Sequence, residues 1–250
     1  MPITRNEDRI GNFTSSKISA LMSNGRAKGS VGKPAFTYIE EKRMERRLKR
    51  SLDLETNARP LTWGQLLEAH VFEILGLEYQ LVSQETVVHP EHKFWAGSPD
   101  ATKLDEGNTV IDIKCPITLK SFCQLVDPLY EGLAGLEAMT QIRNTHKSGN
   151  DYYWQLVSNS ILTGSRYAEL IVFVPYFADL QSVRDFASEA DLDNTHRYYW
   201  INNAVDEELP YLPDKGFYKN VNVIRFEIPE EDKKALEARV ISCGSLLVEG

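Results

Sequence analysis

The sequence predicts an α/β protein in which short β-strands are connected by amphipathic helices. Thr109 to Lys114 alternates apolar and polar residues with a period of two, as a strand does. Leu170 to Val174 is a continuous apolar run, which is typical of a strand buried on both faces. Leu61 to Leu75 repeats apolar residues at helical spacing. With 250 residues, 42% of them hydrophobic, the chain can bury a core, most simply as a single domain over residues 1–250.

The composition narrows the class of protein. No apolar run approaches the roughly 18 residues of a transmembrane helix, and Met1 to Glu7 lacks the apolar core of a signal peptide. The cysteines, Cys115, Cys123 and Cys243, are too few and too scattered for a disulfide framework or an iron–sulfur cluster. We therefore expect a protein of the reducing cytoplasm.

The net charge of −8 does not indicate a nucleic-acid-binding protein, but DNA contact depends on local basic surfaces. Ala35 to Arg50 is predicted to form a charged helix that is dense in Lys and Arg from Lys42 onwards. The pattern fits a solvated helix face as well as it fits a DNA-binding face. Upstream, Thr14 to Ile18 predicts a capped helix start, whose free N–H groups favour anions.

The central motif is a predicted hairpin. Phe94 to Leu104 and Thr109 to Lys114 are the expected strands, joined by a turn at residues 105–108. Alternation along the second strand places Asp112 and Lys114 on one face, away from the neighbouring isoleucines. If the hairpin register pairs Asp100 with Asp112, two carboxylates and one ammonium share a face.

This trio has a chemical use. Two close carboxylates remain ionised at little cost only when a cation lies between them, and oxygen ligands suit Mg²⁺, with Mn²⁺ as an alternative. A water held beside Lys114 is then a candidate nucleophile for attack on phosphorus. The alternative is a solvated hairpin with ordinary outward-facing Asp and Lys side chains, which a pattern as short as Asp-x-Lys does not exclude.

The wider pattern resembles the Pro-Asp…(Asp/Glu)-x-Lys nuclease superfamily. Within it the chain is similar to the lambda exonuclease family of YqaJ-type viral recombinases, from about Arg9 to about Gly164. The resemblance is carried by Ser98-Pro99-Asp100, by Asp112-Ile113-Lys114-Cys115-Pro116 and by a helix that bears Gln155. It implies a restriction-endonuclease-like core, a central mixed β-sheet flanked by helices.

The resemblance also implies roles for single residues. Asp100, Asp112 and the Ile113 carbonyl would bind the metal, and Glu68, four residues after Gly64, would supply a further carboxylate. Lys114 and Gln155 would orient the attacking water. Taken by itself, Glu68 is better explained as an exposed helix residue.

A second group of residues matches the family segment that holds the 5′-terminal phosphate of DNA. Arg9, Ser16 and Ser98 fall on its positions, as do Gly11 and Thr14. Lys120 stands where the family has an arginine, which keeps the charge but loses the bidentate fork. Taken alone, the segment fits a capped helix beside a surface arginine.

The resemblance therefore predicts an Mg²⁺-dependent exonuclease that digests linear double-stranded DNA from 5′ to 3′ in phage-type recombination. It implies a homotrimer that works with a single-strand annealing protein in the cytoplasm of a bacterial host. An endonuclease or single-strand nuclease on the same core is one alternative, and a catalytically silent DNA-end-binding protein is another.

The rest of the chain predicts fewer features. The nuclease core is expected over residues 9–175, with a strand at 220–228 and a helix at 230–248 packed on it. Residues 128–149 resemble an insertion, and residues 179–219 give no clear pattern.

Overall fold

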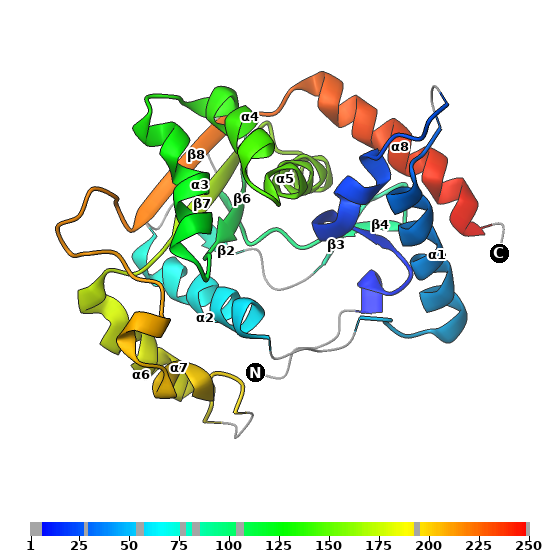
Figure 1. The fold of residues 1–250 in the computed structure, drawn as a ribbon. Coiled ribbons are helices and arrows are strands. Elements are labelled where there is room, and N and C mark those ends of the chain that lie inside the picture. Colours follow the sequence, from blue (N-terminus) through cyan, green and yellow to red (C-terminus); the bar gives the residue numbers. More distant parts are fainter. Residues whose placement is uncertain are drawn as a thin grey trace.

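Two β-sheets organise the computed structural model, which describes residues 7–27, 30–53, 58–75, 79–81, 86–103, 108–192 and 196–248. The larger sheet has the strand order β2-β5-β6-β7-β8, with β6 and β7 parallel and the other neighbours antiparallel. Its strands are β2 (Tyr79–Leu81), β5 (Ala101–Lys103), β6 (Thr109–Lys114), β7 (Tyr167–Phe173) and β8 (Val221–Glu227). Helices flank this mixed sheet, so the predicted fold class is confirmed (Figure 1).

The smaller sheet splits the first strand of the predicted hairpin. It contains β1 (Phe13–Thr14), β4 (Trp95–Gly97) and β3 (Val87–Val88), with β4 in the middle. The expected strand from Phe94 to Leu104 is therefore two strands, because β4 ends at Gly97 and β5 begins in the other sheet at Ala101. Pro99 lies between them, and its missing N–H disfavours an uninterrupted ladder. The predicted turn at 105–108 lies mostly outside the described residues, as do residues 1–6.

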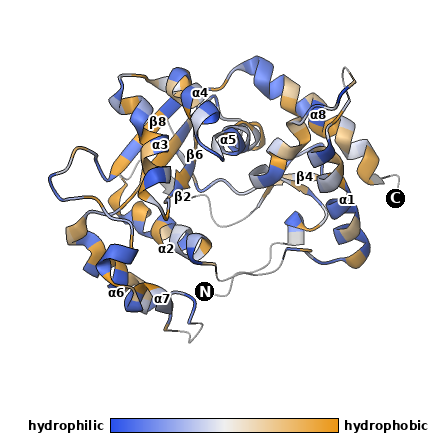
Figure 2. Cartoon of the chain, in the orientation of Figure 1, coloured by the Kyte–Doolittle hydropathy of each residue, from blue (hydrophilic) through white to orange (hydrophobic). Residues whose placement is uncertain are grey.

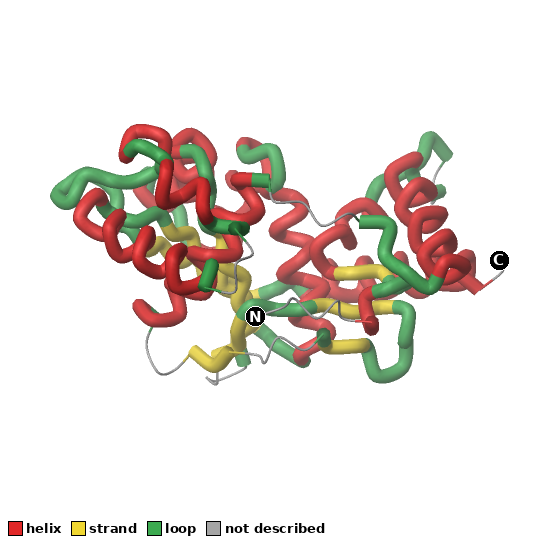
Figure 3. Tube along the Cα trace, turned by 90° about the horizontal axis from the view of Figure 1, so that it is seen from below, coloured by secondary structure: helices red, strands yellow, loops and turns green. Residues whose placement is uncertain are grey.

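The helices surround and connect the sheets. In the view of Figure 3 the strands lie towards the middle, between groups of helices. α5 contacts β6 and β7 of the larger sheet and also β3 and β4 of the smaller one. The described helices are α1 (Lys33–Leu48), α2 (Arg59–Ile74), α3 (Leu119–Tyr130), α4 (Gly135–Thr145), α5 (Gly149–Thr163), α6 (Leu180–Ala190), α7 (Tyr199–Asn203) and α8 (Glu230–Val248), with the 3-10 helices η1 (Glu7–Arg9), η2 (Ser15–Met22), η3 (Phe177–Asp179) and η4 (Asp206–Glu208).

The two faces of β6 pack into different hydrophobic cores. Ile111 and Ile113 join a cluster with α2 and α6, whereas Val110 joins the cluster that includes α3 and α5. Asp112 is on the second face, as the period of two predicts. Hydrophobic and hydrophilic residues alternate along the covering helices (Figure 2). The position of β6 between two packed layers thus brings a carboxylate into a buried environment.

The C-terminal strand and helix are confirmed, whereas the capped helix expected at Thr14 differs from the prediction. β8 and α8 match the strand and helix expected near the C-terminal end. α4 lies in the segment that resembles an insertion, and α6 lies in the segment that gave no clear pattern. The helix expected at Thr14 is the 3-10 helix η2, and Thr14 makes no side-chain cap bond because its hydroxyl lies 3.2 Å from the Tyr38 hydroxyl. Within the described ranges, no helix has both the length and the apolar character needed to cross a membrane.

Candidate active site

Asp100 and Asp112 face each other where β5 meets β6. Ala101 pairs with Ile111 in the antiparallel register, so one step further Asp100 lies opposite Asp112. The Asp100 N–H donates to the Ile111 carbonyl at 3.2 Å, and Asp100 Oδ2 accepts the Ile113 N–H at 2.6 Å. The hairpin therefore has the register that brings the two carboxylates together.

Asp112 is fully buried and is contacted on both carboxylate oxygens. Lys114 Nζ lies 2.7 Å from Oδ2, and Gln155 Nε2 donates to Oδ1 at 2.7 Å. Burial raises the pKa of Asp112 to about 7, although the Lys114 charge opposes that shift. Burial also disfavours the charged Lys114, but Asp112 and Asp100 outweigh it and raise the pKa of this ammonium. Residues of β6 and α5 thus hold the Asp112–Lys114 ion pair at the C-terminal end of β6.

Glu68 reaches the cluster from α2, on the other side of the sheet. Its carboxyl group is hydrogen-bonded to that of Asp100, and burial raises the pKa of both groups. The negative charge of each group also raises the pKa of its neighbours, since Glu68 acts on Asp100 and Asp100 acts on Asp112. Three acidic groups therefore gather around one ammonium, an excess of negative charge that invites a cation.

Tyr152 and His146 form an outer layer that the sequence did not predict as a unit. The Tyr152 ring lies 5.0 Å from Lys114 Nζ in a cation–π contact. His146 stacks on Tyr152 with ring centroids 5.6 Å apart, and its Nε2 lies 2.8 Å from Ser121 Oγ. α3, α4 and α5 together therefore limit where the Lys114 ammonium can move.

Three of the four residues predicted to bind a terminal phosphate lie together. Arg9 Nη1 is 3.5 Å from Ser98 Oγ, and Arg9 Nη2 is 3.4 Å from Ser16 Oγ. Lys120 is exposed at the start of α3, and the structure gives it no contact with the described members of this group. Since Ser98 is two residues before Asp100, this hydroxyl- and guanidinium-lined group adjoins the carboxylate cluster.

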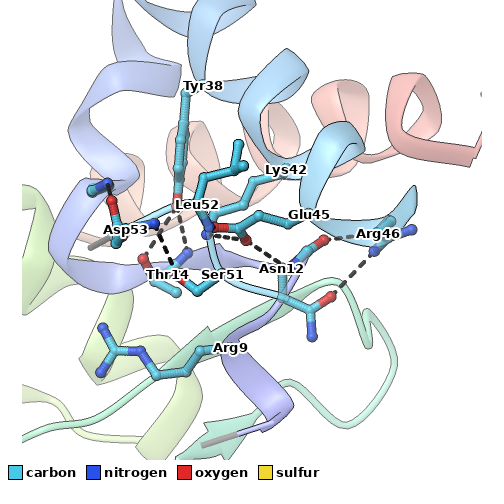
Figure 4. A network of polar contacts seen from close by, with 12 residues as sticks. Arg9, Asn12, Thr14, Tyr38, Lys42, Glu45, Arg46, Ser51, Leu52 and Asp53 are labelled. Atoms are coloured by element: carbon cyan, nitrogen blue, oxygen red, sulfur yellow. Dashed lines mark hydrogen bonds and ion pairs between the residues drawn. The ribbon is translucent and has the colours of Figure 1, made fainter. Parts of the chain in front are cut away.

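The segment that carries Arg9 is fixed by a buried polar network centred on Glu45 (Figure 4). Glu45 Oε2 accepts the Gly11 N–H at 2.8 Å and lies 2.8 Å from Lys42 Nζ, while Oε1 accepts the Leu52 N–H at 3.2 Å. Arg46 Nε donates to the Gly11 carbonyl at 2.7 Å. In Figure 4 the Arg9 guanidinium points away from this network, which leaves it available to a ligand.

The Glu45 network corrects the prediction of a solvated or DNA-facing basic surface only at Lys42, because Arg47, Lys49 and Arg50 are exposed. Lys42 is only 5% exposed and Glu45 only 2%, so this pair belongs to the interior. Gly11 has a φ of +70°, and a Cβ there would lie 2.3 Å from Arg46 Cγ. The close approach of Arg46 therefore requires glycine at this position.

Fold and cluster together define an α/β protein with a carboxylate–lysine site at the C-terminal end of β6, the middle strand of its larger sheet. Residues 6–166 match the model of the YqaJ-like viral recombinase domain. The match covers more than half of the chain, which therefore belongs to the YqaJ-like viral recombinase family. None of the curated proteins compared with the chain matches it.

Solved structures share the whole fold at low sequence identity. The alkaline exonuclease LHK-Exo from Laribacter hongkongensis is 16% identical, with a TM-score of 0.59 over 97% of this chain and 90% of that one. LHK-Exo in complex with dAMP gives 15% identity, the same TM-score and the same coverage. The phage-related exonuclease from Haemophilus somnus 129PT is 13% identical, with a TM-score of 0.60 over 94% of this chain and 93% of that one. At these identities the likeness is one of fold.

Proposed function

We propose that this protein is a DNA exonuclease of phage-type recombination, which hydrolyses the phosphodiesters of linear double-stranded DNA from 5′ to 3′ with Mg²⁺. The observation that carries the proposal is the convergence of Asp100, Asp112 and Lys114 on one strand pair. Membership of a viral recombinase family and a fold shared with proteins named as exonucleases support it.

The residues of the cluster have separable tasks in this reaction. Lys114 offsets the negative charge that develops on the pentavalent phosphorane, and preorganised electrostatics of this kind supply much of an enzyme's rate enhancement. Gln155, whose amide now donates to Asp112, orients the attacking water together with Lys114. The buried contact with Asp112 keeps both groups in place before DNA arrives.

The oxygen donors fit a hard divalent cation. The pKa values of Glu68, Asp100 and Asp112 are all raised, so a cation would relieve their mutual repulsion and their desolvation. The Ile113 carbonyl lies on the same edge of β6 as the Ile113 N–H, which bonds Asp100, and is a further candidate ligand. Bound Mg²⁺ or Mn²⁺ would polarise the scissile phosphate and help activate water.

Cation binding would require the cluster to rearrange slightly. In the described part of the chain, no three His, Cys, Asp or Glu side chains already form a metal-binding group. Asp112 contacts Lys114 and Gln155 with its two oxygens, so Lys114 would have to release Oδ2 to a cation. The released ammonium would then be free to face the phosphate.

The proposed direction of digestion, from 5′ to 3′, rests on Arg9, Ser16 and Ser98. A 5′-terminal phosphate held by this guanidinium and these hydroxyls would lie next to the carboxylate cluster, because Ser98 and Asp100 are separated only by Pro99. Helix η2 begins beside Ser16, and its free N–H groups favour an anion. A 3′ end offers no such terminal phosphate.

Digestion of matched DNA substrates tests the function. Linear, nicked and covalently closed duplexes are incubated with Mg²⁺ or with EDTA, and linear duplexes labelled at either end report the polarity. We expect loss of the 5′ label first, faster on 5′-phosphorylated ends, with the closed circle intact. Cutting of the closed circle would instead assign an endonuclease, and exclusive digestion of single strands a single-strand nuclease. End binding without cleavage would assign a silent DNA-end-binding protein.

The assembly and setting are part of the proposal. A homotrimeric ring would let a subunit with a net charge of −8 hold DNA by facing its basic side chains inward. We also propose a single-strand annealing protein as partner and the cytoplasm of a bacterial host as the setting, with the chain encoded by a phage or prophage. Sedimentation of the purified protein tests the ring, since a monomer at working concentration contradicts the ring and not the nuclease.

A further inference from the structure

A cavity of about 500 Å³ lies where the end of η2 meets α4, α5 and α8. Its walls include Arg143, Arg239, Ser19, Asn24, Asn150 and Trp154. It shares no lining residue with the carboxylate cluster, although α5 contributes to both. Every described lining residue is either cationic or neutral, so the cavity combines two guanidinium groups with hydroxyl and amide groups and contains no carboxylate.

Both arginines are held by neutral acceptors. Arg143 donates from Nε and Nη2 to Asn150 Oδ1 at 3.3 and 3.2 Å. Arg239 donates to the Ser23 carbonyl at 3.3 Å and to Asn24 Oδ1 at 2.9 Å. By contrast, Arg166 pairs with Glu227 at 2.8 Å. In a chain with a net charge of −8, two arginines without a carboxylate partner among the described residues mark a local site for an anion.

Two acidic groups on the neighbouring helices lie beside the cavity but are hydrogen-bonded to neutral groups of its surroundings. Asp151, in the first turn of α5, accepts a hydrogen bond from Ser19 Oγ. Asp232, in the first turn of α8, accepts one from Tyr153. Neither carboxylate forms an ion pair with Arg143 or Arg239 in the described structure, so the positive charge of the cavity is not neutralised by direct pairing.

The cavity is also preorganised. The Arg143 guanidinium lies 3.9 Å from the Tyr153 ring centroid and 5.7 Å from that of Trp154, which restricts its rotamers. Asn150 is in the first turn of α5, where the helix dipole and free N–H groups favour negative charge. At Gly149 a Cβ would lie 2.2 Å from the Ile142 carbonyl oxygen. This close packing of α4 against α5 restricts movement of the two helices relative to each other.

We propose that this cavity binds a backbone phosphate of single-stranded DNA outside the active site, an inference that rests on the proposed nuclease function. Guanidinium, hydroxyl and amide donors are the groups that contact phosphate oxygens in protein–DNA complexes. A duplex is too wide and stiff to enter a cavity of about 500 Å³, whereas a single strand can bend into it. The strand left by digestion is the single strand that the proposed reaction provides.

Binding of a fluorescent 12-nucleotide oligothymidylate in EDTA tests the site without cleavage. Arg239→Gln and the double variant R143Q/R239Q are compared with Arg166→Gln, which removes one charge from a paired arginine and is matched to the single variant. We expect the double variant to weaken binding about tenfold and to lower the slope of log affinity against log salt by about 0.7 per lost phosphate contact. Arg166→Gln should change affinity less than about twofold.

Two further measurements separate the outcomes. R143K/R239K keeps the charges and should retain most of the affinity, and melting curves verify that each variant is folded. Equal affinity in the wild type and R143Q/R239Q, or an equal loss in Arg166→Gln, overturns the site. Competition by a 12-residue oligoglutamate as strong as that by unlabelled oligothymidylate, and dependent on both arginines, assigns an acidic polypeptide instead. Digestion of linear duplex is measured in parallel. Arginine-dependent binding without any nuclease activity would contradict the proposed function and leave the binding site in place.

Discussion

Two regions of this protein bury charged side chains, and they do so in opposite ways. Around Glu45 one carboxylate meets one ammonium, and both oxygens also accept backbone N–H groups. Around Asp112 three acidic groups meet one ammonium, and burial raises the pKa of Asp112 to about 7. The first arrangement is balanced and positions a loop, whereas the second holds excess negative charge.

The difference fits a structural role for the Glu45 region and the catalytic role that we propose for the Asp112 region. A buried ion pair stabilises a fold only when its hydrogen bonds are complete, as they are at Glu45. A site that stores repulsion reduces the stability of the free protein, and this is common where function selects the residues. Substitutions in the two regions should therefore change different measured quantities.

The largest effect is expected at Asp112. Asp112→Asn removes the charge that holds Lys114 and a proposed cation ligand, so Mg²⁺-dependent cleavage of linear duplex should fall by about 10³-fold or more. DNA binding in EDTA and the circular dichroism spectrum should change little, because Asn has the same shape. Asp185→Asn, on the exposed face of α6, is the matched control. Cleavage at the wild-type rate would remove Asp112 from the mechanism.

Substitutions in the Glu45 region should mainly lower the free energy of unfolding. Glu45→Gln leaves Lys42 buried without its partner, so the free energy of unfolding should drop by about 3 kcal/mol. Glu40→Gln breaks an exposed pair of the same spacing on the same helix and should cost less than about 1 kcal/mol. Chemical denaturation measures both.

The same two variants also test the link between Glu45 and Arg9. Since Glu45 fixes the Gly11 segment, Glu45→Gln should raise the KM for 5′-phosphorylated ends by several fold and affect kcat less. If the KM for phosphorylated ends stayed equal to that of Glu40→Gln, the network would support the fold without positioning Arg9.

In the carboxylate cluster, by contrast with Glu45, we expect a substitution to increase the stability of the protein, and to do so only at higher pH. A carboxyl group whose pKa is raised on folding destabilises the protein progressively as pH increases from about 4 towards the folded pKa. Asp100→Asn removes this loss, and its amide can donate a hydrogen bond to Glu68. The metal-free variant should therefore be more stable than the wild type near pH 8, with no gain near pH 4.

Divalent cations provide the control for that prediction. Mg²⁺ or Mn²⁺ should raise the melting temperature of the wild type and have little effect on Asp100→Asn, because ligand binding to the folded state adds stability. Equal stabilisation of both proteins by the cation would argue that Asp100 is not a ligand.

The contrast between the regions also explains what the sequence could predict. The local alternation of β6 predicts that Asp112 and Lys114 share a face, and the family pattern adds Asp100, Glu68 and Gln155, whereas the register of Asp100 against Asp112 is given by the pairing of β5 with β6. The Glu45 network gives no such signal, because Lys42 and Glu45 are spaced like an ordinary surface pair on a charged helix. Only packing against the Gly11 segment, 34 residues away, makes that pair interior.

The sequence did not predict the split between β4 and β5, for a related reason. Phe94 to Leu104 has strand-forming residues on both sides of Pro99, and pairing partners decide that each half joins a different sheet. β4 pairs with β1, whose residues come from the N-terminal part of the chain, a contact that no local pattern records. The break brings Ser98 and Asp100 next to each other at the junction of the two sheets.

The smallest effect is expected at Lys120, which the resemblance assigns to the phosphate group but which the structure leaves exposed and apart from Arg9. An exposed ammonium contributes mainly long-range attraction, whereas a guanidinium can also form two parallel hydrogen bonds with a phosphate. Lys120→Arg should therefore lower the KM for 5′-phosphorylated duplex by about twofold to threefold and leave 5′-hydroxyl ends unchanged. Arg9→Lys, which removes a fork already in contact with Ser16 and Ser98, should raise that KM by more than Lys120→Arg lowers it. An equal response of phosphorylated and unphosphorylated ends to Lys120→Arg would show that this position attracts DNA in general and does not recognise the terminal phosphate.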